Sequence, residues 1–146
     1  MSRGPVHFLL VEDDDSHAEL VRLVVEETGC RDSVDRVADG PAALAYLRRE
    51  GAYAAARRPA AVLLDLRLGA MDGHEVLQEI KADPQLRATP VIVLSSSGGD
   101  RDRARAYANY ANSFLVKPLD FDDYRVLIRD LRAYWGGHNR PAPPVL

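Results

Sequence analysis

Five short apolar runs alternate with stretches of helical periodicity, and this rhythm constrains the fold more than any other feature of the chain. The runs cover residues 7–11, 33–37, 60–64, 91–94 and 113–116. Short strands that alternate with amphipathic helices are typical of βαβ units, which build a parallel sheet covered by helices on both faces. We therefore predict an α/β protein: a flavodoxin-like (βα)5 doubly wound parallel sheet with strand order 2-1-3-4-5.

Capping residues place the helices between these strands. Aspartate is a preferred N-cap residue, and proline is favoured at the first helical position, as in Asp39-Gly40-Pro41. We expect helices from about residue 15 to 29, from 40 onward, over 73–82, from about 100 to 107, and from 120 to about 135, where Gly136-Gly137 would end the last one. The expected N-caps are Asp14 or Asp15, Asp39, Asp100 and Asp120.

The length of 146 residues suits a single domain with one substantial core. We assign residues 1–5 to an N-terminal extension, 6–135 to the domain, and 136–146 to a flexible, proline-rich tail. One link departs from the rhythm, because residues 50–59 make a longer connection into the third strand than a minimal unit needs.

Composition excludes several classes of partner. A net charge of −3 argues against a nucleic acid, whose phosphates demand a basic surface. No apolar stretch approaches the roughly 18 residues that a membrane span needs. The single cysteine, Cys30, excludes an intramolecular disulfide framework and fits the reducing cytoplasm. We expect a cytoplasmic protein that binds neither nucleic acid nor membrane.

Polar groups of complementary chemistry follow four of the five strands. Glu12 and Asp13 come after the first strand, Asp65 ends the third, Ser95 ends the fourth, and Lys117 follows the fifth. Open parallel sheets bind ligands at the carboxyl ends of their strands, where the strand order reverses. In the order 2-1-3-4-5 this point lies between the first and third strands, so the three carboxylates are expected to meet there.

Three adjacent carboxylates repel one another unless a cation lies among them. Oxygen ligands in an incomplete shell suit Mg²⁺, which retains several waters and accepts phosphate oxygens. We assign Asp13 and Asp65 as direct ligands and Glu12 as the holder of a metal-bound water. The backbone carbonyl of Arg67 is a further candidate ligand.

Asp65 is also the candidate nucleophile, since carboxylates form acyl phosphates. Phosphoryl transfer needs in-line positioning and neutralisation of the equatorial oxygens. Mg²⁺ can neutralise one oxygen and the Lys117 ammonium another. The Ser95 hydroxyl and the backbone N–H of Ser96 can reach the rest.

Four segments resemble the receiver domain of two-component response regulators: Val11-Glu12-Asp13-Asp14, Leu63 to Gly73, Leu94-Ser95-Ser96 and Leu115-Val116-Lys117-Pro118. The resemblance covers about residues 6–135. It implies that Asp65 takes a phosphoryl group from an upstream histidine kinase, that Ser95 then swings toward the phosphate, and that Phe114 turns inward. It further implies a switch surface on the fourth helix, fifth strand and fifth helix, an unknown downstream protein partner, and no enzymatic activity beyond self-phosphorylation and autodephosphorylation.

A narrower resemblance connects the chain with single-domain regulators that pair with bacterial phytochrome-type kinases. The longer link at 50–59, the approach Ala111-Asn112-Ser113-Phe114 and the end Ala133-Tyr134-Trp135 carry it. It implies a homodimer through the surface formed by the fourth helix, fifth strand and fifth helix.

The chain departs from the family pattern beside the proposed acceptor. Gly69-Ala70 stands where the family usually has proline and glycine, which should loosen the loop. Arg67 and Ser97 lie two residues after Asp65 and Ser95, at positions that tune dephosphorylation in the family. We therefore expect Arg67 to alter the lifetime of the phosphoryl group.

Two alternatives remain open from the residues alone. A haloacid-dehalogenase-type phosphatase also uses a strand-end aspartate, but it needs a second aspartate where Arg67 stands. An interaction module of receiver fold that works without phosphorylation is the other alternative, and the intact Asp13, Asp65, Ser95 and Lys117 argue against it.

Overall fold

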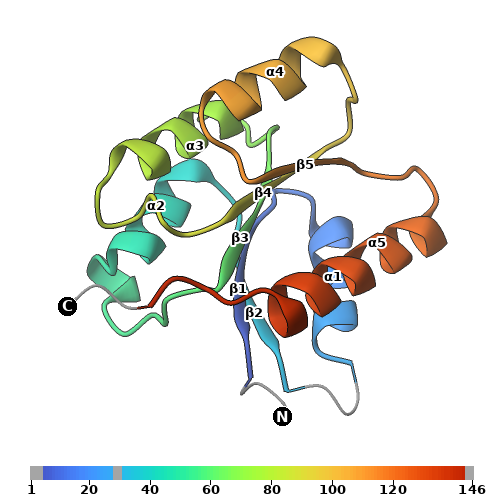
Figure 1. The fold of residues 1–146 in the computed structure, drawn as a ribbon, viewed down its shortest axis with the longest axis horizontal. Helices are drawn as coiled ribbons and strands as arrows, with labels where there is room; N and C mark the ends of the chain where they lie inside the picture. The colour runs from blue at the N-terminus through green and yellow to red at the C-terminus, as the bar shows by residue number, and fades with distance from the viewer. Residues whose placement is uncertain (1–4, 28–30, 144–146) are drawn as a thin grey trace.

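The computed structural model describes residues 5–27 and 31–143, and its centre is one parallel sheet (Figure 1). The strand order is β2-β1-β3-β4-β5, which confirms the predicted doubly wound topology. The strands are β1 (His7–Val11), β2 (Ser33–Val37), β3 (Ala61–Asp65), β4 (Val91–Ser95) and β5 (Ser113–Val116). Cys30 and parts of both predicted terminal extensions lie outside the described residues.

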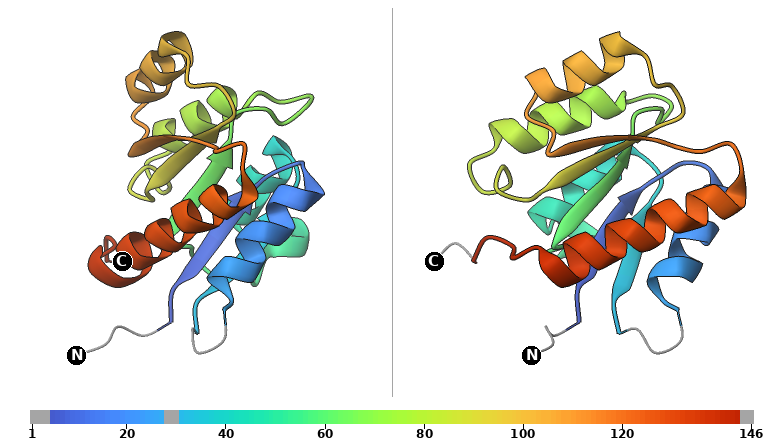
Figure 2. Two further views of the ribbon diagram at one scale, coloured as in Figure 1. Left: turned by 90° about the vertical axis from the view of Figure 1, so that its right-hand side faces the viewer. Right: turned by 45° about the vertical axis from the view of Figure 1, so that its right-hand side comes forward.

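Helices cover both faces of the sheet, so the molecule has three layers (Figure 2). α1 and α5 lie side by side on one face, and α2, α3 and α4 cover the other. The helices are α1 (Asp15–Val25), α2 (Gly40–Arg48), α3 (Gly73–Ala82), α4 (Asp100–Ala108) and α5 (Phe121–Ala133), with a 3₁₀ turn η1 (Gly51–Tyr53) and a π-helical turn η2 (Tyr134–His138). None of the helices in the described residues has the length and apolar character that would let it cross a membrane.

The core consists of two apolar layers, one on each face of the sheet. Every residue of β1, β3 and β4 is buried, as expected for central strands covered by helices on both sides. On one face Phe8 and Leu63 pack with α1 and with Ile128 of α5, whereas on the other face Leu9 and Leu64 pack with α2 and α3. This packing fixes the carboxyl ends of the strands, and therefore the side chains that follow them.

Side-chain caps begin most helices as the sequence predicts. Asp14, Asp39 and Asp120 each accept a backbone N–H at the start of α1, α2 and α5. Asp100 was expected to cap α4, but the N-cap residue is Gly99. Asp100 is instead the first helical residue and pairs with Arg103 at 2.7 Å, so its charge still lies at the positive end of the helix dipole.

The carboxyl-terminal end of α5 differs from the expected stop at Gly136-Gly137. α-Helical geometry ends at Ala133, and the chain continues as a π-helical turn through His138. Gly136 is buried, and a Cβ there would lie 3.0 Å from an Asp32 carboxylate oxygen and 3.6 Å from the Phe8 ring. The glycine lets the turn pack closely against the sheet.

Candidate functional site

The parallel sheet brings the predicted site residues together at the carboxyl ends of its strands. Asp65 ends β3 and Ser95 ends β4, while Glu12 and Lys117 come directly after β1 and β5. The backbone N–H of Lys117 donates a 2.7 Å hydrogen bond to the Ser95 carbonyl oxygen, which extends the pairing of β4 with β5 by one residue. Four distant segments of sequence therefore form one site.

Lys117 lies buried between two carboxylates. Its Nζ donates to Glu12 Oε1 at 2.5 Å and to Asp65 Oδ2 at 3.0 Å. The residue is only 5% exposed, and Glu12 and Asp65 are 0% and 6% exposed. A buried charge is costly unless it is paired and hydrogen-bonded, so this geometry holds the ammonium at the oxygen atoms of the proposed acceptor.

The charged form of Glu12 is disfavoured by its surroundings. Burial raises its pKa to about 7, and the neighbouring Asp65 carboxylate acts in the same direction. Hydrogen bonding to Lys117 lowers the pKa but does not outweigh these two effects. Since one ammonium serves two buried carboxylates, the side chains alone leave this site short of positive charge.

A divalent cation fits this shortage of positive charge. One carboxylate oxygen from each of Glu12, Asp13 and Asp65 lies within 4.8 Å of the other two. Asp13 is exposed while the others are buried, so the cluster opens to solvent on one side. Oxygen donors in an open, incomplete shell suit a hard cation that keeps part of its water. Ligation by the Arg67 carbonyl remains a prediction.

The backbone around Asp65 orients its carboxylate. Oδ1 accepts a 3.0 Å hydrogen bond from the backbone N–H of Arg67, while Oδ2 accepts from Lys117. α3 begins directly beneath this loop at Gly73, where a Cβ would lie 2.5 Å from the Asp65 carbonyl oxygen and from Leu66 Cα. Only glycine allows the helix to start so close to the acceptor.

The proposed switch residues lie beside the carboxylates on β4 and β5. The Ser95 hydroxyl donates to the Ser97 carbonyl oxygen at 2.8 Å and accepts from the Ser97 N–H at 3.1 Å. The Ser95 hydroxyl proton is thus used by its own loop, and it has to turn away from the Ser97 carbonyl oxygen before it can donate to another acceptor. Phe114 is half-buried and packs against the apolar layer on the α3 and α4 face.

His17 joins the site although its spacing gave no metal-binding or catalytic signal. Its Nδ1 lies 3.2 Å from Lys117 Nζ, and since ammonium only donates, Nδ1 is the acceptor. The ring also makes edge contacts with Phe121 and Tyr124 of α5. One sequence signal could have found it: His17 lies in the first turn of a helix that starts directly after the acid pair Glu12-Asp13. The other histidines of the described residues, His7, His74 and His138, lie elsewhere, on β1, α3 and η2.

The fold is a doubly wound sheet, and four of its strand ends carry an acid pair, an aspartate, a hydroxyl and a lysine. This combination defines a class of phosphoryl-acceptor domains. Comparison with known proteins gives the family to which the chain belongs. The family model of the response regulator receiver domain matches residues 8–129. The chain is 46% identical over 145 residues to the probable methanogenesis regulatory protein FilR2 of Methanothrix harundinacea, covering 99% of this chain and 92% of FilR2. It is 35% identical to the response regulator Rcp1 of Synechocystis, covering 92% and 91%.

Solved structures agree with the sequence comparison. The phosphorylated cyanobacterial phytochrome response regulator RcpA superposes with a TM-score of 0.92 at 34% identity, covering 96% of this chain and all of that one. The Mn²⁺-bound form of Rcp1 gives a TM-score of 0.89 at 33% identity, covering 95% of this chain and all of that one. The chain belongs to the response regulator receiver family, and this membership leaves the phosphatase interpretation without support.

Proposed function

We propose that this protein is a response regulator in which Asp65 accepts a phosphoryl group from a sensor histidine kinase and thereby changes partner binding. The observation that carries the proposal is the Asp65 carboxylate, held by Lys117 and the Arg67 N–H beside an open cluster of acids. Family membership and the Mn²⁺-bound form of Rcp1 support it. We propose Mg²⁺ as the cation, bound by Asp13 and Asp65 with Glu12 holding a metal-bound water.

In the reaction, one Asp65 carboxylate oxygen attacks the phosphorus of a phosphohistidine. The new O–P bond forms as the P–N bond breaks, and the imidazole nitrogen leaves with its electron pair and takes up a proton. Charge on the equatorial oxygens needs fixed positive groups around the phosphorus. Lys117 supplies one such charge, and when bound, the cation supplies another. We propose that the chain catalyses only its own phosphorylation and dephosphorylation.

The switch runs from the phosphoryl group to the surface of α4, β5 and α5. The Ser95 hydroxyl leaves the Ser97 backbone to bond a phosphoryl oxygen, and the space it vacates admits Phe114. Seven of the eight large apolar side chains that are exposed among the described residues lie between positions 107 and 134. They are Tyr107, Tyr110, Val116, Leu119, Phe121, Val126 and Tyr134. They belong to α4, β5, α5 and η2 or to the loops that join these elements, and exposed apolar groups that gather in one part of a molecule mark a protein-binding site.

We propose that this surface binds either a second copy of the chain, giving a homodimer, or an unknown downstream protein. Leu119 is fully exposed and Tyr110 is 75% exposed, so contact with a partner would remove considerable apolar area from water. Light scattering with and without beryllofluoride, a phosphoryl mimic, tests the dimer. A mass that stays monomeric at high micromolar concentration in both states would reject the homodimer.

We further propose a cytoplasmic protein whose kinase is of the phytochrome type, because RcpA is described as a phytochrome response regulator. The test is a phosphotransfer profile: radiolabelled histidine kinases of the source organism are mixed singly with wild type and with Asp65→Asn. The expected result is rapid, Asp65-dependent transfer from a phytochrome-type kinase, faster than from any other. Preferred transfer from another kinase would reject the pairing. Failure with every kinase and with acetyl phosphate would favour the phosphorylation-independent interaction module.

A further inference from the structure

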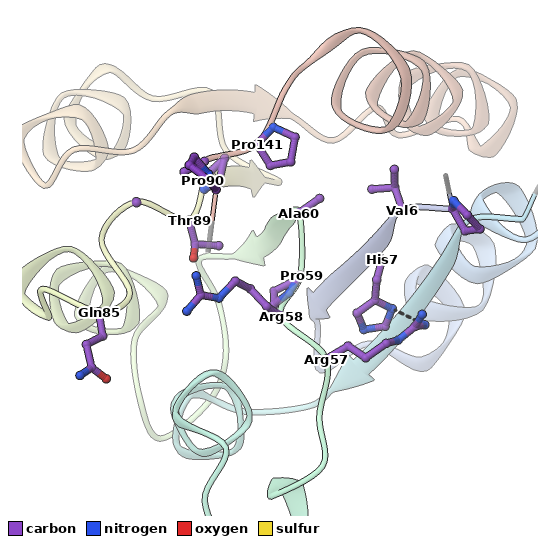
Figure 3. Close-up of a pocket in the computed structure, with 14 residues that line it drawn as sticks. Val6, His7, Arg57, Arg58, Pro59, Ala60, Gln85, Thr89, Pro90 and Pro141 are labelled. Carbon is purple, nitrogen blue, oxygen red and sulfur yellow. Dashed lines mark hydrogen bonds between the residues drawn. The ribbon is translucent and has the colours of Figure 1, made fainter. Parts of the chain in front are cut away.

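A cavity lies at the opposite end of the sheet from Asp65, and the receiver chemistry does not use it (Figure 3). Its volume is about 500 Å³, within the range of small-molecule sites. The start of β1, the link before β3, the segment before β4 and the chain after η2 surround it. We call it the amino-edge cavity, because the amino ends of the central strands open into it.

The walls of the amino-edge cavity are largely apolar. Five prolines line it, namely Pro5, Pro59, Pro90, Pro141 and Pro143. Val6 and three alanines fill the spaces between them. Proline side chains have little rotamer freedom, so they lose little side-chain entropy when an apolar body packs against them.

The charged groups that line this cavity are all basic. Arg57 and Arg58 enter it from the long link, and Gln85 and Thr89 add neutral donors. Neither aspartate nor glutamate lines it. In a chain of net charge −3, two arginines at a cavity with no acid among its lining residues favour an anion.

The two arginines have different roles, and Figure 3 shows them pointing in opposite directions. Arg57 donates to Ser33 Oγ at 2.7 Å and lies 3.3 Å from His7 Nδ1, so its guanidinium is held by side chains of β1 and β2. Arg58 extends toward Thr89 and has neither an ion pair nor a hydrogen bond among the residues that the structure describes. Its planar guanidinium is free to bind an oxyanion with two parallel hydrogen bonds.

A smaller cavity of about 200 Å³ continues past the same guanidinium. Both link arginines line it together with Arg48 and Arg49, and its one acid, Asp83, pairs with Arg48 at 3.6 Å. The excess of positive charge therefore persists beyond the amino-edge cavity, and no neighbouring carboxylate in either lining is left to neutralise Arg58.

We propose that the amino-edge cavity binds a small organic anion, with an apolar ring against the prolines and a carboxylate or phosphate group on Arg58. Thr89 and Gln85 lie on the same side of the cavity and offer further hydrogen bonds to the anionic oxygens. An apolar ring is the part of the ligand that fits the proline walls. The anionic group is the part that pairs with Arg58, which has no partner among the described residues.

Phenyl phosphate and benzoate are suitable probes, followed by amide chemical shifts in EDTA so that the acidic site cannot bind phosphate through a cation. At least one probe should bind at millimolar concentration and shift Val6, Ala60 and Thr89, and the stronger probe identifies the preferred anion. Arg58→Gln should weaken binding about tenfold, the factor that one charge-assisted hydrogen bond supplies. Gln85→Glu should also weaken binding about tenfold, because it places a negative charge beside the anion while leaving Arg58 in place. Arg101→Gln, which removes an exposed charge on α4, should leave binding unchanged.

Each part of the proposal has a result that overturns it. If neither anion shifts residues at this edge of the sheet, the site does not exist. If inorganic phosphate binds as tightly as phenyl phosphate, the proline walls contribute nothing and the organic part is wrong. If neutral benzyl alcohol binds as tightly as benzoate, or if Arg58→Gln and Arg101→Gln have equal effects, recognition of the anion is wrong.

Discussion

Replacement of Glu12 by glutamine should stabilise the metal-free protein at alkaline pH. Glu12 is fully buried, and its pKa rises from the ordinary 4.5 to about 7 because burial and Asp65 disfavour its charge more than Lys117 favours it. At about 1.4 kcal/mol per pH unit, ionising Glu12 at pH 8 costs the folded state about 3 kcal/mol. Glutamine keeps the shape of the protonated acid and avoids this cost.

The sign of the pH dependence follows from the direction of the shift. A carboxyl whose folded pKa is raised contributes stability that is complete below 4.5 and is lost as the pH rises through about 7. The difference between Glu12→Gln and wild type should therefore be near zero at pH 4.5 and should reach about 3 kcal/mol at pH 8. Excess Mg²⁺ should reduce the difference, since a ligand that prefers wild type stabilises it by mass action.

Urea unfolding in EDTA at several pH values measures this difference, and Glu19→Gln is the matched control. Glu19 lies exposed on α1, so its replacement should change the unfolding free energy by no more than about 0.5 kcal/mol at any pH. If Glu12→Gln is less stable than wild type at pH 8 in EDTA, then the ion pair with Lys117 dominates and the proposed shortage of positive charge is wrong.

Other substitutions test the hydrogen bonding and packing of buried groups and the rate of dephosphorylation. Tyr46→Phe should cost about 1–2 kcal/mol in urea unfolding, because the buried Tyr46 hydroxyl makes hydrogen bonds of 2.6 and 2.7 Å. Tyr124→Phe should be neutral or stabilising, because the Tyr124 hydroxyl is buried and has no hydrogen-bond partner among the described residues; an equal loss for both would refute the distinction. Gly73→Ala should cost about 1–3 kcal/mol and slow acetyl phosphate labelling, since its Cβ would overlap the backbone at Asp65; wild-type stability would contradict the close approach. Arg67→Asn should change the dephosphorylation rate several-fold in a single-turnover decay, and an unchanged rate would remove its tuning role.

The fold was predictable because each strand ends within one residue of the end of its apolar run. A parallel register then places the following residue at a common edge, so Asp65 and Lys117 meet although 52 positions separate them. The start of α2 was equally predictable, since Asp39 caps its own helix through a local hydrogen bond.

Features that depend on side-chain rotamers or on distant packing were not predictable. The Ser95 hydroxyl can bond a phosphoryl group or its own loop, and sequence does not decide between them. His17 reaches Lys117 only because α1 packs beside α5. The capping of α4 by Gly99 rather than Asp100 was missed because two adjacent residues both favour a helix start.

The amino-edge cavity is the feature of the structure that the sequence predicts least. The sequence predicts a long link over residues 50–59, but the length of a link does not tell where its side chains point. The divergence of Arg57 and Arg58 depends on the His7 and Ser33 side chains, which come from two neighbouring strands. Only the assembled sheet shows that one arginine is held and the other is free.

The central claim is that Asp65 carries the phosphoryl group, and peptide mapping after incubation with acetyl phosphate and Mg²⁺ tests it most directly. The account predicts one phosphoryl group per chain, located on Asp65, stable in acid, released by hydroxylamine, and absent both from Asp65→Asn and from wild type in EDTA. A label that persists in Asp65→Asn, or a wild-type protein that takes up none, would contradict it.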